Sequence, residues 1–384
     1  MTIPVFHSHG LIFLSFFIYA FVLGTLFPRI GDLQQQMGLG EGALGLSIIG
    51  LPLGLQLSLI MADRVLRRVS MRIIMIVGTA TMSVFYTLAA LVANVPIFFA
   101  CVFMVGLAVG FMEVAVNLET DRIENVIKRR IMNRAHAFWS LGFFATGLMG
   151  ALMAQMQISV AVHFASFGAI ALVATLFCFW GYKQAPERSP NAATSQVLFV
   201  RPTKAILVLV LLSLPALLAE GSSIDWSVIF MRDTFATPPF INGMALALVA
   251  LSQFATRYHA DHIVDRYGPQ RVSLVCLWIL FVGVWLVVLS PDWRIALIGF
   301  TSMGAGSSVI FPLAVSAAAQ FVDRPAAVNV AALAQISFGL FLLAPPLLGF
   351  VAEHIGIRYA FAICLPLVII SFFSIHGLST KKQP

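Results

Sequence analysis

The sequence has little charge for its length. Of its 384 residues only 10% are Asp, Glu, Lys or Arg, whereas 60% are hydrophobic. Soluble domains carry about 25% charged residues, so a chain of this composition would not remain in water. The scarcity of charge argues against a soluble enzyme, a nucleic-acid-binding protein and a secreted disulfide domain, and it indicates an integral membrane protein.

Motifs for metals, nucleotides and catalysis are also missing. The four cysteines lie inside apolar runs without a CxxC pair or a His at ligand spacing, which indicates neither a disulfide framework nor a metal site. The phosphate-binding pattern GxxxxGK[ST] does not occur, and neither do HExxH or GxSxG. We therefore expect no cofactor, no ATP-driven step and no enzymatic activity.

What the chain has is a series of apolar runs, each long enough to cross a membrane, which takes about 20 residues. Charged, Pro and Gly clusters separate the runs. The runs predict an all-α membrane protein with twelve transmembrane helices, and these are expected at 10–30, 43–62, 72–92, 95–118, 136–156, 159–181, 204–230, 240–259, 272–290, 293–319, 327–351 and 357–377.

The basic residues indicate how these spans are oriented. Twelve spans place both termini on one side, and all but four of the 23 Lys and Arg residues would lie on that side. The exceptions are Arg29, Arg232, Arg294 and Arg358. Because basic loops stay in the cytoplasm, this bias predicts cytoplasmic termini for a multi-pass membrane protein.

An internal repeat divides the chain into halves. Asp63 to Arg72 follows the second span, and Asp261 to Arg271 follows the eighth span with a similar pattern of acids and bases. The longest polar stretch lies between the sixth and seventh spans. We predict two pseudo-symmetric six-helix halves, 1–182 and 204–384, joined by a cytoplasmic linker, 183–203. Parallel six-span repeats are the architecture of major facilitator transporters.

Several motifs resemble this superfamily. The loop Asp265 to Arg271 has its pattern DRxGxxR, and longer motifs occur at 112–119, 136–142, 219–226 and 345–354. Together they resemble the YbjJ-type branch of bacterial inner-membrane facilitators, which is similar to the fucose permeases. The resemblance implies a transporter fold over nearly the whole chain.

Glu113 is the main functional candidate. An ionisable side chain inside hydrocarbon costs about 2.5–3.5 kcal/mol, so one that persists usually has a function. Asn117 follows one helical turn later on the same face. Glu113 and Asn117 also match the span-four pattern of the fucose permeases, which implies a proton or sugar role for Glu113. Gly24 and Trp139, by contrast, stand where those permeases carry Asp and Asn.

A carboxyl group that alternates between apolar and aqueous surroundings can take up and release a proton, as proton symport requires. We therefore assign proton coupling to Glu113; the alternative is a hydrogen-bonded acid that only fixes helix packing. Glu220 belongs to a polar run expected to interrupt span seven near Gly221, where a discontinuous helix would contact the solute. It is equally well interpreted as a structural acid, and the sequence leaves open which acid carries coupling.

Further polar residues in the spans are expected to line the substrate cavity or to bridge helices. They are Asn117, Trp139, Ser140, Glu220, Ser223 and Gln335. Asp225 and Trp226 are expected nearer the outer end, in a structural or gating role. His136 lies at a predicted span boundary, where hydrogen bonding to loop carbonyls is favoured over a proton relay.

The charged hairpins are expected to act as cytoplasmic gates through ion pairs that break when the cavity opens inward. The alternative is that their bases only set topology. These gating candidates are Asp63, Arg64, Arg67, Arg68, Arg257, Asp261, Asp265, Arg266 and Arg271.

The resulting hypothesis is a secondary transporter that moves a small polar solute, sugar-like in one interpretation, by alternating access and proton symport. Its expected partners are the solute, protons and the bilayer, without nucleic acid, and we expect a monomer driven by the proton gradient. A proton-coupled exporter of amphipathic compounds stays open, although span five contains none of the prolines typical of such exporters. A non-transporting membrane sensor is the third alternative.

Overall fold

The computed structural model describes residues 8–129, 131–186 and 200–378, and these fold into helices without strands. The first half contains α1 (Ser8–Gly24), η2 (Phe27–Arg29), α2 (Ile30–Met37), α3 (Glu41–Ile48), α4 (Gly50–Leu66), α5 (Met71–Leu91), α6 (Val95–Ile127), α7 (Met132–Gln155) and α8 (Val160–Cys178). The second half contains α9 (Lys204–Phe235), α10 (Pro239–Tyr267), α11 (Pro269–Val288), α12 (Trp293–Ser307), α13 (Ile310–Gln320), α14 (Ala326–Leu342), α15 (Ala344–His354), α16 (Ile357–Ala362), α17 (Cys364–Ser374) and η3 (Ile375–Leu378).

These elements make twelve spans in the described part of the chain, as predicted. Helices α6, α9 and α10 continue beyond the ends of their predicted apolar runs, to Ile127, Phe235 and Tyr267. The runs stop at charged residues, but charge ends only the hydrocarbon crossing, and an α-helix continues beyond it where its sequence allows.

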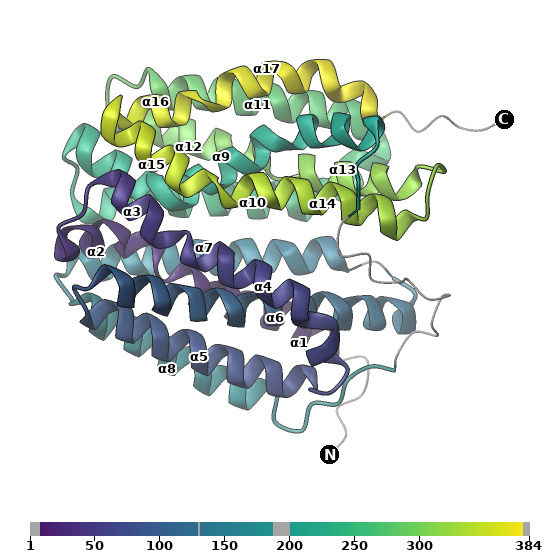
Figure 1. Cartoon of the computed structure of the whole chain (residues 1–384), viewed down its shortest axis with the longest axis horizontal. Coiled ribbons are helices and arrows are strands. Elements are labelled where there is room, and N and C mark those ends of the chain that lie inside the picture. Colours follow the sequence, from purple (N-terminus) through teal and green to yellow (C-terminus); the bar gives the residue numbers. More distant parts are fainter. Residues whose placement is uncertain (1–7, 130, 187–199, 379–384) are drawn as a thin grey trace.

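The two sets of six spans form two layers in Figure 1, the first half below and the second half above. Helices α7 and α10 pack against each other across the layers, and α3 packs against α15. The predicted linker boundaries, 183–203, stay a prediction, because residues 187–199 lie outside the described part of the chain.

We call the membrane side of Ser8 and Leu378 the terminal side and the other the opposite side. On the opposite side the halves are in close contact. A Cβ at Gly45 of α3 would lie 2.5 Å from the Pro345 carbonyl oxygen, and Glu353 Oε2 accepts a 2.8 Å hydrogen bond from the Gly42 amide. Arg232 of α9 donates to Gly31 O at 3.1 Å. Glycine therefore permits the backbones of α3 and α15 to touch.

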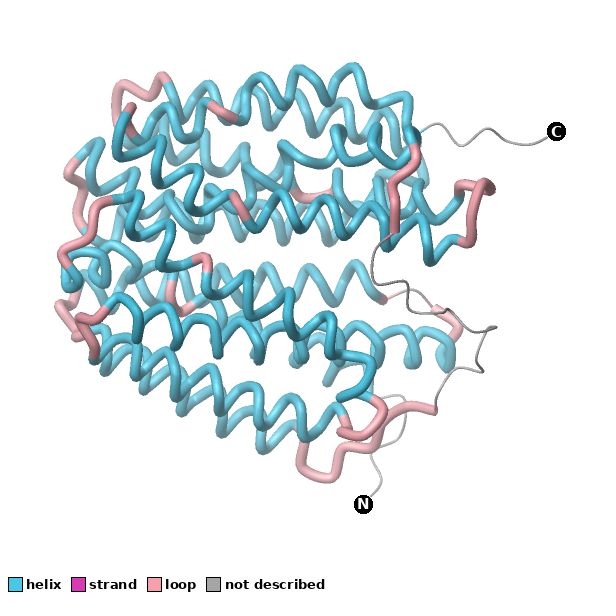
Figure 2. The backbone as a smooth tube through the Cα atoms, in the orientation of Figure 1, coloured by secondary structure: helices cyan, strands magenta, loops and turns pink. Residues whose placement is uncertain are grey.

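Toward the terminal side the paired spans separate. Helix α4, which continues α3, packs against α6 of its own half, and α14, which precedes α15, packs against α9 and α13. Figure 2 shows the tubes of α4 and α14 drawing apart in that direction. The halves are thus joined at the opposite side and along α7 and α10.

The predicted interruption of span seven is wrong. Helix α9 is continuous from Lys204 to Phe235 through Gly221. The hydroxyls of Ser222 and Ser223 bond to Ala219 O at 3.0 and 2.7 Å, so these two serines of the polar run are satisfied within the helix. Such back-bonding to the preceding turn leaves the helix intact.

Two prolines free a backbone carbonyl on the preceding helical turn. Span ten is divided between α12 and α13 at Ser308, four residues before Pro312. Proline has no N–H and leaves the carbonyl four residues earlier without its helical donor. In α9 the same effect of Pro215 frees Leu211 O, which accepts a 2.7 Å bond from Ser371 Oγ of α17.

Candidate transport site

Glu113 lies partly buried in α6, and both of its carboxylate oxygens are hydrogen-bonded. The Tyr19 hydroxyl of α1 donates to Oε2, and Asn117 Nδ2 donates to Oε1 at 2.9 Å. Asn117 Nδ2 also lies 2.8 Å from the Glu113 carbonyl oxygen. The spacing of four residues on one helix brings Glu113 and Asn117 together, as the sequence predicts.

His136 bonds to Asn117 and so belongs to the polar group around Glu113. The expectation that His136 bonds to loop carbonyls is therefore wrong. Helix α7 begins at Met132, so His136 lies a turn inside the helix. Its Nε2 is 3.2 Å from Asn117 Oδ1, and its ring meets the Phe16 ring edge-on at 5.0 Å. An amide oxygen only accepts, so this contact assigns the proton to Nε2 of His136.

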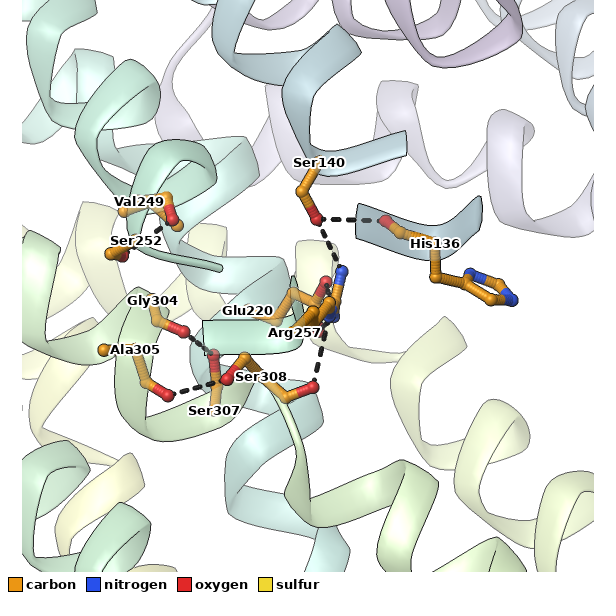
Figure 3. A network of polar contacts seen from close by, with 10 residues as sticks. All are labelled: His136, Ser140, Glu220, Val249, Ser252, Arg257, Gly304, Ala305, Ser307 and Ser308. Atoms are coloured by element: carbon orange, nitrogen blue, oxygen red, sulfur yellow. Dashed lines mark hydrogen bonds and ion pairs between the residues drawn. The ribbon is translucent and has the colours of Figure 1, made fainter. Parts of the chain in front are cut away.

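A second polar group surrounds Arg257 (Figure 3). Arg257 Nη2 lies 3.1 and 3.3 Å from the two carboxylate oxygens of Glu220 on α9. Its Nη1 donates to Ser140 Oγ on α7 at 2.9 Å, and its Nε donates to Ser308 O at 3.2 Å. Arg257 lies within α10 and bonds across the two halves, and the gating role predicted for it stays a prediction.

The break in span ten provides one of these contacts. Ser308 O would accept the amide of residue 312 in a continuous helix, and that residue is Pro312. The freed carbonyl accepts Arg257 Nε instead. The discontinuous helix expected in span seven therefore occurs in span ten, where its unwound carbonyl binds a charged side chain.

The two polar groups meet on α7. Ser140 Oγ is 3.4 Å from the His136 carbonyl oxygen, one turn earlier on the helix. In Figure 3 the His136 ring points away from Arg257. Its hydrogen bond with Asn117 places α6 on the side of α7 to which the ring points. Helix α7 thus lies between Glu113 on α6 and the Arg257–Glu220 pair.

The other predicted cavity residues are spread more widely. Trp139 packs against Phe143 with the rings tilted by 32° and their centroids 4.3 Å apart, and it interacts with the Tyr19 side chain, which brings it beside Glu113. Ser223 is buried and bonded inside α9. Gln335 Oε1 accepts the Val200 amide at 3.0 Å, so it lies at the linker end on the terminal side rather than beside Glu113.

Asp225 of α9 is partly exposed and interacts electrostatically with Tyr86 of α5. Trp226 is 1% exposed, and its indole nitrogen has no partner in the described part of the chain. Trp226 lies close to Gly349 of α15. This position fits the structural role expected for Trp226, at the contact between the halves.

The charged hairpins lie at the terminal side. Their arginines are exposed, and Arg266 covers the Tyr267 ring at 5.3 Å. Asn133 of α7 donates a hydrogen bond to Asp261 of α10 and so joins the halves there. The side chain of Asp63 lies outside the described part of the chain. The gating role of Asp63, Arg64, Arg67, Arg68, Asp261, Asp265, Arg266 and Arg271 stays a prediction.

Sequence reasoning missed Tyr19 and Ser308. Tyr19 is the one tyrosine in the first predicted span, and that isolated hydroxyl was the available signal. Ser308 acts through its backbone, for which the signal was Pro312 four residues later. Among the described residues no group of three or more His, Cys, Asp and Glu side chains could hold a metal ion.

Comparison with protein families decides the classification. A family model of the Major Facilitator Superfamily matches residues 12–230 and 216–382. The chain belongs to this superfamily. Its members are transporters rather than enzymes, and this chain is accordingly a multi-pass membrane transporter with twelve spans that carries a small-molecule solute. The predicted superfamily and fold are confirmed.

Relatives of similar length have no assigned substrate. The chain is 26% identical to an uncharacterized transporter, y4wD, of Sinorhizobium fredii (strain NBRC 101917 / NGR234), covering 91% of this chain and 92% of the relative. It is 24% identical to an uncharacterized MFS-type transporter of Yersinia pestis, covering 93% and 92%. These relatives support the family and leave the solute open.

Solved structures share the fold at low identity. The nucleoside transporter NupG, as a D323A mutant, has a TM-score of 0.75 at 12% identity and covers 97% of this chain and 100% of its own. A D-xylose-proton symporter has a TM-score of 0.72 at 12% identity, covering 100% and 98%. FucP in the outward conformation has a TM-score of 0.66 at 14% identity, covering 97% and 99%.

Proposed function

We propose that this transporter moves a small polar solute across a bacterial inner membrane by proton symport, with Glu113 as the coupling carboxyl. The observation that carries the proposal is the set of contacts on Glu113. Tyr19, Asn117 and, through Asn117, His136 come from three helices and surround one partly buried acid. An intramembrane acid held by exchangeable hydrogen bonds can gain and lose a proton as its surroundings change.

The names of two fold neighbours are compatible with this proposal: one is a D-xylose-proton symporter and another is a nucleoside transporter. The basic residues favour a cytoplasmic terminal side. With that orientation, the close contact of α3 with α15 corresponds to a state closed on the outside. Alternating access would then open this contact and bring α4 toward α14. We further propose that the protein acts as a monomer.

The test replaces Glu113 by Gln in proteoliposomes. A solute is first identified by its stabilisation of the purified protein against heat, because a ligand that binds the native state raises its apparent stability. Glu113→Gln should abolish accumulation driven by a proton gradient while exchange of internal for external solute continues. Full accumulation by this variant would overturn the role of Glu113.

Glu119→Gln is the matched control, since it makes the same change on the same helix. Glu119 is 1% exposed and accepts bonds from Tyr182 Oη at 2.8 Å and the Ala185 amide at 2.7 Å. It is a structural acid, so its variant should retain proton-driven accumulation. If only amphipathic compounds stabilise the protein, the exporter becomes the better proposal.

A further inference from the structure

Arg257 is a cation inside the bundle for which proton coupling at Glu113 gives no role. A guanidinium stays charged in proteins and is costly within hydrocarbon. Arg257 and Glu220 have side-chain exposures of 14% and 17%, so the pair is neither sealed in the core nor free at the surface. Its bond to Ser140 places it at the interface of the two halves, where a solute passes during alternating access.

Glu220 uses only part of the guanidinium. Both of its oxygens face Nη2, whereas a bidentate pair would engage two nitrogens through parallel bonds. Nη1 has one contact with the described residues, to Ser140 Oγ, although it carries two hydrogens. One hydrogen of Nη1 therefore remains available, and Nη2 becomes available to a second planar acceptor once Glu220 leaves it.

Arg257 is also held independently of Glu220. Ser140 Oγ and Ser308 O are neutral acceptors on α7 and at the α12–α13 break. They would keep the guanidinium in position if Glu220 moved away. Glu119 of α6 is the contrasting case, since Tyr182, the Ala185 amide and Arg122 all hold it, and its side chain is only 1% exposed.

From this geometry we propose that Arg257 binds a carboxylate carried by the solute, and that Glu220 is the intramolecular group which this carboxylate displaces from Nη2. The inference rests on the proposed function and names the class of solute, a small organic anion. Arg257 and Glu220 balance each other in charge, so a bound anion adds one negative charge. A proton taken up at Glu113 would restore the balance, which is a reason for such a site to be coupled to protons.

The experiment measures equilibrium binding by thermal stabilisation of the purified full chain at constant sodium and ionic strength. The probes are matched pairs of an acid and its neutral counterpart: D-glucuronate with D-glucose, D-galacturonate with D-galactose, D-gluconate with sorbitol, and L-lactate with 1,2-propanediol. We expect at least one acid to stabilise the protein at a concentration about tenfold below that of its counterpart, as a charge-assisted hydrogen bond predicts.

Variants separate the roles of the pair. Arg257→Gln should remove the preference for the acid, and Arg257→Lys should weaken it, since an ammonium cannot hold Ser140, Ser308 and a carboxylate in one plane. Arg294→Gln is the control, because Arg294 is exposed on the opposite side. If Arg257→Gln does not fold, Glu220→Gln still decides: removing the competing carboxylate should preserve or tighten binding of the acid.

Four results would overturn the inference: equal stabilisation by acid and neutral members, no stabilisation by any of the acids, an unchanged preference for the acid in a folded Arg257→Gln variant, or loss of acid binding in Glu220→Gln. These failures differ from failure of the proposed function, because binding needs no proton gradient. A neutral solute accumulated through Glu113 would overturn only the anion site. An acid that binds at Arg257 but is not accumulated would overturn only proton symport.

Discussion

Glu113 and His136 bond to the two ends of one side-chain amide. Asn117 Nδ2 donates to Glu113 Oε1 at 2.9 Å, while Asn117 Oδ1 lies 3.2 Å from His136 Nε2. If the Asn117 amide turned by 180°, its oxygen would face the Glu113 carboxylate oxygen, and both atoms are acceptors. The two contacts therefore fix one orientation of the amide. This arrangement links an acid on α6 with an imidazole on α7 and makes Asn117 a sensitive position.

A double-mutant cycle on Asn117 and His136 measures this link. Asn117→Leu and His136→Phe should each destabilise the protein, and together they should do so by less than the sum, because either change breaks the same interhelix bond. The expected coupling is about 0.6 kcal/mol, typical of hydrogen bonds between membrane helices. Reversible unfolding in mixed micelles provides the measurement.

Ser222 serves as the comparison for that cycle. Its hydroxyl bonds to Ala219 O of its own helix, so Asn117→Leu combined with Ser222→Ala should be additive within about 0.5 kcal/mol. A coupling of zero between Asn117 and His136 would mean that their contact does not stabilise the fold.

Pro312 allows a prediction about the break in span ten. Pro312→Ala adds a backbone amide that can bond to Ser308 O and compete with Arg257 Nε. We expect the variant to be at least as stable as the parent but to bind its solute about fivefold more weakly, the equivalent of one net hydrogen bond of about 1 kcal/mol. Thermal unfolding and ligand titration give the two values.

Pro215→Ala is the matched control, because Leu211 O is taken by Ser371 of α17 rather than by a site residue. It should leave solute affinity unchanged. Hydrogen exchange checks the mechanism: the new amide at position 312 should be protected. Equal affinities in the two proline variants would argue against a role for the break in positioning Arg257.

The sequence predicts where the spans lie but not where they are interrupted. Apolar runs define the spans well, and the second was expected at 43–62 and lies at Glu41–Ala62. The break in span seven was predicted from Gly221 and its polar neighbours, but helical hydroxyls bond to their own backbone. The break at Ser308 in span ten follows instead from the missing N–H at Pro312.

The candidate site was predictable only where it is local. Glu113 and Asn117 are four residues apart on one helix, and helical geometry alone joins them. Tyr19 and Glu113 are 94 positions apart, and Ser140 and Arg257 are 117 apart. Such contacts depend on how helices pack, which the periodicity of one sequence does not encode, so the partners of Arg257 could not be predicted.

Closure of the opposite side depends on glycine at position 45. A Cβ there would lie 2.5 Å from Pro345 O, a backbone atom that cannot move cheaply. Gly45→Ala should therefore separate α3 from α15 and accelerate amide hydrogen exchange in both helices. Mass spectrometry of the exchanged peptides measures this.

Gly339→Ala is the comparison on α14, where a Cβ would meet nothing within 4 Å. There the added methyl group should disturb no contact, and it should stabilise the helix by up to about 1 kcal/mol because alanine has a higher helix propensity than glycine. Unchanged exchange in α3 and α15 of the Gly45 variant would show that the two backbones tolerate a wider spacing.

Tyr182 provides a prediction for pH. Burial, together with the neighbouring Glu119 carboxylate, raises the pKa of Tyr182 well above its ordinary value of 10.0. The folded state therefore holds this proton more tightly than the unfolded chain, and the resulting stability is present below pH 10.0 and decreases as pH rises further. Tyr182→Phe removes the group and with it this dependence.

At neutral pH Tyr182→Phe should cost about 1–2 kcal/mol, because Glu119 loses the 2.8 Å bond from Tyr182 while keeping the Ala185 amide. Above pH 10.0 the stability difference between parent and variant should shrink, since only the parent must lose the Tyr182 proton. Unfolding measured from pH 7 to 11 tests this. A difference that stays constant would mean that Tyr182 titrates alike in both states and that Glu119 does not hold its proton.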